Sequence, residues 1–323
     1  MTDRITMEEK FFSTNYKFSY SGLNKLLFSP RLWYKHYVLL DREDRTDKHL
    51  IDGKVIHALL LDQDNFTRNF IMLPGNLPTG NTRTVVDKVF SMVSDESLLD
   101  DNHDLIIATL VEINLHQSLK TDKQRIAKIV SEDTESYWDF LKNKGNKDII
   151  DQVTLDRCKE NADILKNDDR IKALLRIGNV KKEVKVYNEL PIERGLPDYP
   201  FGLKGILDNI IVDDIEKMVY INDIKTTGKT ISDFEESVEY WNYWLQAAVY
   251  AELIKDMYPA DYKLKFTFIV IDIYQQVYPF EVSTKTMTKW TEKFQEVLQD
   301  AKWHYDNRKF NLPIKFEKET VIL

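Results

Sequence analysis

The chain has 323 residues, of which 43% are hydrophobic and 30% charged, and its formal net charge is −8. This composition predicts a soluble globular protein with one large domain or two ordinary ones. The negative charge argues against a protein that coats nucleic acid through bulk charge, but not against a nuclease with a local basic groove. The single cysteine, Cys158, excludes an internal disulfide framework and a zinc or iron–sulfur site built from cysteines.

The first twelve residues carry charges throughout and have no apolar centre, so they do not predict a secretory signal. No apolar run approaches the roughly 18 residues that a membrane-spanning helix needs. We therefore expect a reduced, cytoplasmic protein that does not use a membrane.

The N-terminal half of the chain has the apolar spacing of helices. Residues 17–40 predict a turn followed by helical segments that pack on the core, or, alternatively, that border a nucleic-acid groove with Arg31 and neighbouring aromatic side chains. Residues 50–63 predict a short apolar helix that carries His57. Taken alone, a histidine in such a place is more often a core residue than a metal ligand. Residues 83–177 predict helices almost throughout.

From residue 180 onward the spacing changes to the alternation of strands. We expect one strand within 180–192, two within 202–225, a helix over 231–255, two more strands, a closing helix over 284–307 and a partly extended tail. This order predicts an α/β fold with a mixed central sheet of about five strands, flanked by helices and preceded by a large helical N-terminal portion.

The stretch Gly202–Thr227 carries charged residues within two otherwise apolar strands. Asp208 lies in the first strand, and the second ends in Asp223-Ile224-Lys225. Alternation places Asp223 and Lys225 on one face, about 7 Å apart along the strand. Because an unpaired charge on an apolar strand face is costly, two carboxylates and a lysine predict a metal site or a reaction there.

These residue types suit phosphodiester chemistry. Carboxylates are the hard oxygen ligands that Mg²⁺ and Mn²⁺ prefer, and Lys225 could orient an attacking water or stabilise negative charge on a phosphate. The helix expected next carries Gln246 and Tyr250 on one face, four residues apart. They are interpreted either as the polar edge of a packing helix or as groups that face the carboxylates.

Four short motifs follow one another along the chain. They are G-x-x-x-H (Gly53 to His57), G-I-L-D (Gly205 to Asp208), D-I-K (Asp223 to Lys225) and Q-x-x-x-Y (Gln246 to Tyr250). In this order they resemble PD-(D/E)XK nucleases of the RecB type, and most of all the phage and prophage exonucleases similar to exonuclease VIII (RecE). No single motif is specific, so the resemblance rests on their order over residues 17–255.

The resemblance implies a restriction-endonuclease-like core with assigned roles for this chain's residues. The catalytic residues it implies are Asp208, Asp223 and Lys225. The metal ligands it implies are His57, Asp208, Asp223 and the carbonyl of Ile224. The residues it implies as supporting the site or contacting DNA are Gln246, Tyr250, Glu183 and Arg31. The cofactor would be one or two ions of Mg²⁺ or Mn²⁺, and an imidazole ligand makes Mn²⁺ at least as suitable as Mg²⁺.

The implied activity is that of a metal-dependent DNA exonuclease acting on double-stranded ends, 5′-to-3′, in phage-type recombination. The resemblance also implies a ring-like homo-oligomer, a single-strand annealing protein as partner, and the cytoplasm of a bacterial cell or a phage-infected host. The alternatives are a single-strand or flap nuclease of the same superfamily, and a non-catalytic DNA-binding module on the nuclease fold. Against the last, Asp208, Asp223 and Lys225 are all present.

We expect a single nuclease domain over residues 1–323. It would consist of N-terminal helices with the histidine motif (1–82), a helical insertion (83–177) and the nuclease core (178–323).

Overall fold

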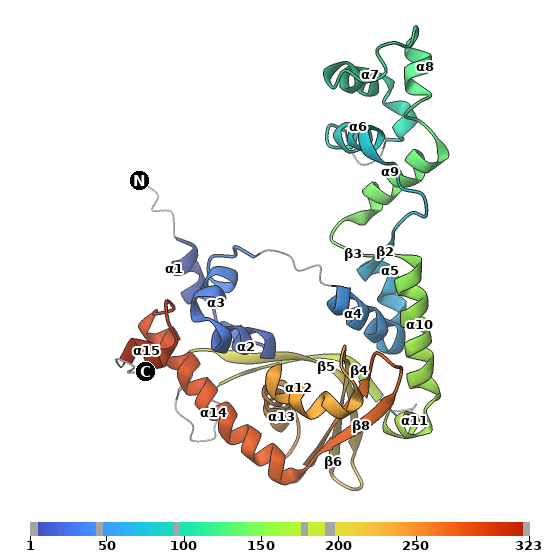
Figure 1. Cartoon of the computed structure of the whole chain (residues 1–323). Coiled ribbons are helices and arrows are strands. Elements are labelled where there is room, and N and C mark those ends of the chain that lie inside the picture. Colours follow the sequence, from blue (N-terminus) through green and yellow to red (C-terminus); the bar gives the residue numbers. More distant parts are fainter. Residues whose placement is uncertain (1–5, 43–47, 94–96, 176–179, 191–197, 319–323) are drawn as a thin grey trace. The chain divides into compact units, whose positions relative to one another are not determined.

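The computed structural model describes residues 6–42, 48–93, 97–175, 180–190 and 198–318 (Figure 1). The chain forms two compact units. The first, called the sheet unit, comprises Met1–Gly53, Leu60–Asp62 and Asn161–Leu323, and the second, called the helical unit, comprises Lys54–Leu59 and Gln63–Glu160. None of the helices in the described part of the chain has the length and apolar character that a membrane crossing needs.

A six-stranded mixed sheet is the centre of the sheet unit. Its strands are β1 (Lys17–Phe18), β4 (Val180–Glu189), β5 (Gly202–Asp213), β6 (Met218–Thr226), β7 (Lys263–Ile271) and β8 (Val277–Val282). They are ordered β1-β5-β6-β7-β8, and β4 also pairs with β5. The β4–β5, β5–β6 and β7–β8 pairs are antiparallel, whereas β1–β5 and β6–β7 are parallel. The expected α/β class with a mixed sheet is therefore confirmed.

The parallel pair β6–β7 lies in the interior of the sheet. The last six residues of β7 are all buried, which explains why this strand reads as a continuous apolar run rather than an alternation. The chain crosses from β6 to β7 through helix α13 (Tyr243–Met257), whose residues from Trp244 to Ile254 are all buried. A parallel connection requires such a crossover, and here it places α13 against β5.

The sheet unit has an aromatic core that includes Phe18, Trp33, Phe201 and Phe310. The helices that contribute residues to the same cluster include α1 (Met7–Phe12), α2 (Tyr20–Phe28), α3 (Pro30–Tyr37), α12 (Phe234–Tyr240) and α14 (Thr284–Asn307). Further helices of this unit are α11 (Asp169–Leu175), α15 (Ile314–Lys318) and part of α4 (Lys48–Leu61). The C-terminal tail differs from the sequence expectation. The tail forms helix α15 where a partly extended segment was expected, with residues 319–323 outside the described residues.

The helix expected over 231–255 is broken. Asn242 adopts a left-handed conformation with φ of 56°, and this residue separates α12 from α13. Tertiary hydrogen bonds hold the break: Asn242 donates from Nδ2 to Asn24 at 2.8 Å, and Tyr20 donates to the Trp241 carbonyl at 2.5 Å. Because these partners come from α2, more than 200 positions earlier, helical periodicity could not reveal the break.

The helical unit has its own core, which contains Val86, Leu99, Ile106, Leu110 and Trp138. Its elements are α5 (Phe66–Asn69), β2 (Phe70–Met72), α6 (Gly80–Phe90), α7 (His103–Glu112), α8 (Asp122–Ile126), α9 (Glu132–Lys144), β3 (Asp148–Ile150) and most of α10 (Gln152–Asn167). The short parallel pair β2–β3 was not expected from the sequence.

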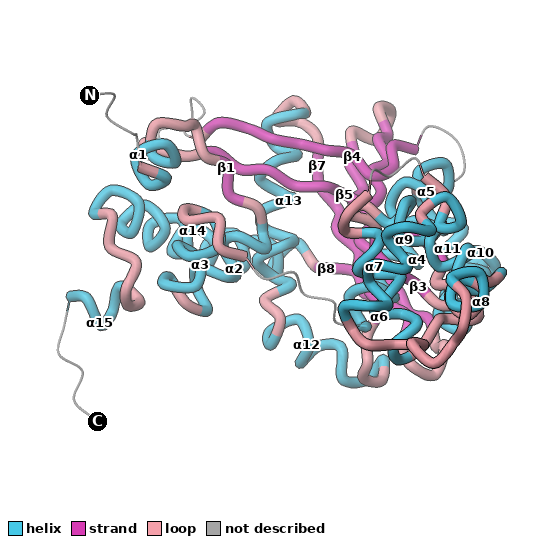
Figure 2. The backbone as a smooth tube through the Cα atoms, turned by 90° about the horizontal axis from the view of Figure 1, so that it is seen from above, coloured by secondary structure: helices cyan, strands magenta, loops and turns pink. Residues whose placement is uncertain are grey.

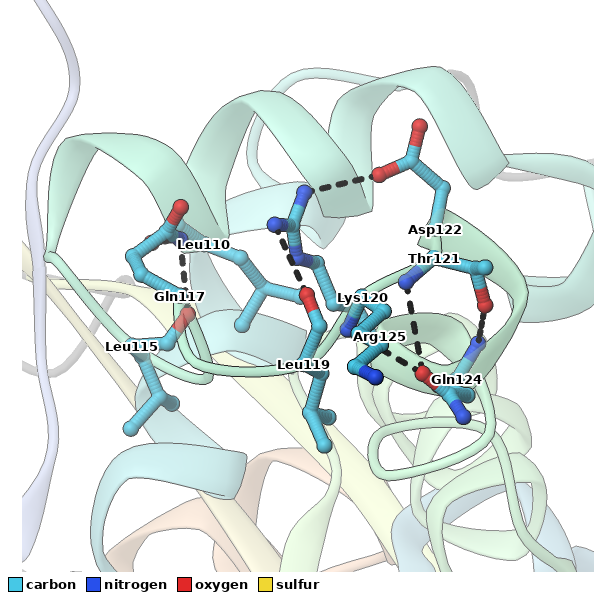
Figure 3. Close-up of polar contacts among 9 residues, drawn as sticks. All are labelled: Leu110, Leu115, Gln117, Leu119, Lys120, Thr121, Asp122, Gln124 and Arg125. Carbon is cyan, nitrogen blue, oxygen red and sulfur yellow. Dashed lines mark hydrogen bonds and ion pairs between the residues drawn. The ribbon is translucent and has the colours of Figure 1, made fainter.

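Side-chain hydrogen bonds shape the connection between α7 and α8 (Figure 3). Gln117 donates to the carbonyls of Leu110 and Leu115, at 2.9 and 2.8 Å. Arg125 donates to the Leu119 carbonyl at 3.1 Å and to Asp122 at 2.8 Å. These bonds satisfy the loop carbonyls of Leu115 and Leu119, and they add to the backbone N–H of Leu115 that the Leu110 carbonyl already accepts, which gives this loop a defined path.

Candidate active site

The site begins where β5 and β6 stop pairing. Their ladder extends from the Asp213–Met218 pair to the Asn209–Asn222 pair. At the next position Asp208 replaces the ladder: its Oδ2 accepts the backbone N–H of Ile224 at 2.7 Å. The side chain of Asp208 is buried. This hydrogen bond to a backbone amide orients the carboxylate and favours its charged form.

Asp223 contacts Gln246 of helix α13 and Lys225, which lies two residues further along β6. Gln246 of α13 donates from Nε2 to Asp223 Oδ1 at 3.0 Å, and Lys225 forms an ion pair with Asp223 Oδ2. The Lys225 ammonium also lies 5.0 Å from the centre of the Tyr243 ring. Burial alone would lower the pKa of Lys225, but the nearby Asp223 and Asp208 carboxylates more than offset this and raise it. Lys225 is therefore a cation at neutral pH.

A chain of hydrogen bonds joins this pair to β5. Gln246 Nε2 also donates to the Tyr250 hydroxyl at 3.0 Å, and that hydroxyl donates to the carbonyl of Ile206 at 2.6 Å. Burial, with nearby Asp223 and Asp208, raises the pKa of Tyr250 well above its usual range, so its hydroxyl remains a donor. The structure therefore brings Gln246 and Tyr250 to the carboxylates, and their role in supporting the site or contacting DNA stays a prediction.

Gly205 allows α13 to approach β5 this closely. A Cβ atom at Gly205 would lie 2.9 Å from Tyr250 Cε1 and 3.0 Å from Leu253 Cδ1. Ordinary side-chain contacts are longer than this, so only glycine fits without a shift of the helix. The glycine of the G-I-L-D motif thus has a packing role that the spacing of the motif did not reveal.

Glu183 of β4 lies opposite Asp208, because Lys182 pairs with Asn209 and Val184 with Leu207 on either side of it. Like charges that face each other across a strand pair repel, unless a cation lies between them. Glu183 also has a φ of 49°, which is rare for a residue with a side chain and is strained within a strand.

His57 completes this group. It lies on α4, whose first six residues and last two belong to the sheet unit, and a Cβ at Gly53 would lie 3.3 Å from Thr226 Oγ1. The first residue of the G-x-x-x-H motif therefore sits against the end of β6, and His57 follows one turn later. One ligand atom from each of His57, Glu183 and Asp208 lies within 4.8 Å of the other two.

The chain matches a known nuclease family over most of its length. A family model described as the PD-(D/E)XK nuclease superfamily matches residues 17–311. The chain belongs to the PD-(D/E)XK nuclease superfamily. It is therefore a nuclease, and nucleases of this superfamily use divalent metal ions.

Two solved structures are similar at low sequence identity. One is a protein from Eubacterium rectale named as a candidate exonuclease, which is 12% identical in sequence and has a TM-score of 0.49. The match covers 100% of this chain and 94% of that chain. The other is the protein SSO0001, with 11% identity, 76% of this chain and 86% of that chain covered, and a TM-score of 0.25. No curated protein has a sequence that matches this chain.

The residues of this PD-(D/E)XK nuclease fit a divalent cation. Two carboxylates and an imidazole offer one ligand atom each within a small space, which matches the hard and borderline donors of Mg²⁺ and Mn²⁺ sites. The buried Gln246 Oε1 also has no hydrogen-bond partner among the described residues. A metal-bound water is a donor that would satisfy this oxygen, because a buried acceptor without a partner is costly.

The cluster differs from the ligand set that the motifs imply, because it includes Glu183 and does not include Asp223. Glu183, interpreted from the sequence only as a supporting residue, lies in the three-residue group, whereas Asp223 is held by Gln246 and Lys225 beside it. The signal in the sequence was its place on the strand preceding the hairpin. Tyr243, whose ring faces Lys225, was not anticipated at all.

Arg31 is not part of this cluster. It lies on α3 and lines a different cavity, of about 530 Å³, whose other lining residues include Tyr34, Lys35, Arg308 and Phe310. None of the residues of the candidate site lines that cavity. A role for Arg31 in contacting DNA stays a prediction.

Proposed function

We propose that this nuclease is a metal-dependent deoxyribonuclease that digests double-stranded DNA from its ends. The observation that carries the proposal is the meeting of four motifs at one place. Asp208, Asp223 and Lys225 lie at the diverging ends of β5 and β6, and the Gln246 amide contacts Asp223 there. Carboxylates buried close together repel one another and so destabilise the folded protein. A buried cluster of this kind is therefore better explained by catalysis than by a purely structural role.

The proposed ligands of the divalent ion are His57, Glu183 and Asp208, with Asp223 and the Ile224 carbonyl next to them. When bound, the ion would supply Lewis acidity toward a phosphodiester oxygen and lower the pKa of a water ligand. Lys225 is proposed to stabilise the negative charge that develops on the phosphate oxygens. Asp223 orients the Lys225 ammonium, and Gln246 holds Asp223 in place.

The preference for DNA ends, the 5′-to-3′ direction, a ring-like homo-oligomer and an annealing partner are proposed from the motif resemblance to the exonuclease VIII group. One nuclease domain over residues 1–323, with residues 83–177 as a helical insertion, also belongs to the proposal. The phage-type recombination role belongs to the same proposal.

The proposal is tested with linear, closed circular and end-labelled DNA, each incubated with Mg²⁺, Mn²⁺ or EDTA. We expect degradation of the linear DNA with either metal, none in EDTA, and intact circles. Equal cutting of closed circles would overturn the end specificity, and no degradation of any DNA would overturn the deoxyribonuclease. Duplexes labelled at the 5′ or the 3′ end then determine the direction of digestion.

A matched pair of variants tests the site itself. Asp223→Ala should abolish digestion while the protein remains folded, because Lys225 and Gln246 lose the carboxylate that orients them. The exposed Asp261, on the turn before β7, serves as the control, and Asp261→Ala should retain activity. Full activity of Asp223→Ala would mean that another carboxylate carries the reaction.

A further inference from the structure

A strip of exposed side chains extends along β4 and β5 away from the carboxylates. The strands are antiparallel, and the register pairs Lys185 with Ile206 and Tyr187 with Lys204. Figure 2 shows β4 and β5 side by side at one side of the sheet. We call these four residues the β4–β5 strip.

The strip follows Glu183 and Asp208 along the same two strands. Side chains two positions apart on a strand project to the same side, and so do directly paired residues of neighbouring strands, so the four residues of the strip share one face. At the rise of an antiparallel strand, the Lys185–Ile206 pair lies about 7 Å from the Glu183–Asp208 position, and the Tyr187–Lys204 pair about 14 Å from it. The strip therefore adjoins the candidate site along these two strands.

Burial separates this face from the opposite one. Val186 and Leu207, which point the other way, are buried in the core. Tyr187 is 71% exposed and Ile206 46% exposed, and both lysines are exposed. Tyr187 and Ile206 thus present apolar surface next to the two lysines.

The two lysines of the strip also differ from many others in the molecule. Lys17, Lys265 and Lys293 form ion pairs with glutamates. The Lys185 ammonium has no ion pair or hydrogen bond within the described residues, and the only contact of the Lys204 ammonium within them is with the Tyr16 ring, 6.0 Å away. In a chain with a net charge of −8, two lysines without carboxylate partners beside an acidic site suit an anionic ligand.

We propose that the β4–β5 strip binds a single strand of DNA that enters or leaves the carboxylate cluster. Lys185 and Lys204 contact successive backbone phosphates, and Tyr187 stacks on a base. A duplex hides the faces of its bases, whereas a separated strand exposes them to an aromatic side chain. The inference rests on the proposed function, in which DNA is the substrate. It adds that the strand is held unpaired on this side of the site.

The test measures binding of a short fluorescent single-stranded oligonucleotide in EDTA, where no cleavage interferes. Tyr187→Ala should weaken binding by roughly 5- to 150-fold, the range for loss of one stacked base. Lys185→Glu with Lys204→Glu should weaken binding and reduce the slope of log affinity against log salt by about 1.4, because each phosphate contact on a single strand contributes about 0.7. Thermal unfolding of each variant verifies that it is folded. We expect all of them to fold, because the substituted side chains are exposed.

Matched controls make the result specific to the strip. Lys285→Glu with Lys289→Glu changes the net charge equally on the exposed face of α14, and Tyr274→Ala removes a tyrosine that is 67% exposed elsewhere. Both controls should bind as the unmodified protein does. The proposed binding of single-stranded DNA by the strip would be overturned by an equal loss of binding in the controls or by unchanged binding in the strip variants. A loss of binding that affects duplex DNA alone would overturn it too. A protein that binds the oligonucleotide through the strip yet degrades no DNA would overturn the proposed function and leave the strip intact.

Discussion

Substitution of Gly205 by alanine should disturb both stability and the candidate site. The added Cβ would lie 2.9 Å from Tyr250 Cε1, 3.0 Å from Leu253 Cδ1 and 3.3 Å from Tyr250 Cδ1. Both neighbours are buried side chains of α13, so neither can turn into solvent. Overpacking of this kind costs about 1–3 kcal/mol. We expect the free energy of unfolding to fall by that amount.

The same substitution should reduce activity more than the loss of stability explains. Movement of the Tyr250 ring displaces its hydroxyl, which Gln246 contacts, and Gln246 in turn contacts Asp223. A displacement of about 1 Å at such a group can reduce a rate about 100-fold. Nuclease activity on linear DNA should therefore fall by up to about 100-fold under conditions where the variant is fully folded.

Urea unfolding and initial rates of digestion measure the two effects. Gly228→Ala is the matched control, because Gly228 follows β6, is exposed, and a Cβ atom added there would meet no atom of the described residues within 4 Å. That variant should be neutral or more stable by up to about 1 kcal/mol, with full activity. Equal unfolding midpoints and equal rates for the two variants would refute the close packing of α13 on β5.

Three further variants test other parts of the structure. Tyr250→Phe removes the donor to the Ile206 carbonyl and should destabilise the protein by about 1–3 kcal/mol in urea unfolding, and no loss would argue against that hydrogen bond. In metal-free buffer the free energy of unfolding of Glu183→Gly should be about 1 kcal/mol higher than that of Glu183→Ala, because glycine adopts the left-handed conformation without strain. A higher value for Glu183→Ala would contradict the strain at this residue. Burial lowers the pKa of His304 below its ordinary 6.5, so the stability it contributes is present above pH 6.5 and is lost as the pH falls through the lowered value. His304→Gln should therefore flatten the pH dependence of the unfolding midpoint below pH 6.5, and an unchanged profile would exclude this residue as its source.

Much of the sheet unit could be predicted from local patterns. Alternation located β4, β5 and β6, and the closing helix has the bounds 284–307 in both the sequence analysis and the structure. The break at Asn242 and helix α15 were missed. The break depends on hydrogen bonds from α2, and contacts so distant in sequence leave no trace in a helical period.

Residue types and their order along the chain were enough to indicate the chemistry. Two aspartates and a lysine on apolar strands predicted a site, and four ordered motifs indicated a superfamily that the family match then established. These features are local: each motif lies within one turn of helix or a few residues of strand, and its physical meaning follows from charge and periodicity alone.

Only the tertiary structure decided how these residues are arranged. The antiparallel register places Glu183 opposite Asp208, and the packing of Gly205 against Tyr250 brings Gln246 to Asp223. Strand register and helix crossover are properties of pairing between distant segments, and a shift by one residue would turn each of these side chains to the other face. The sequence alone therefore indicated what kind of groups the site contains, and the fold decided which of them meet.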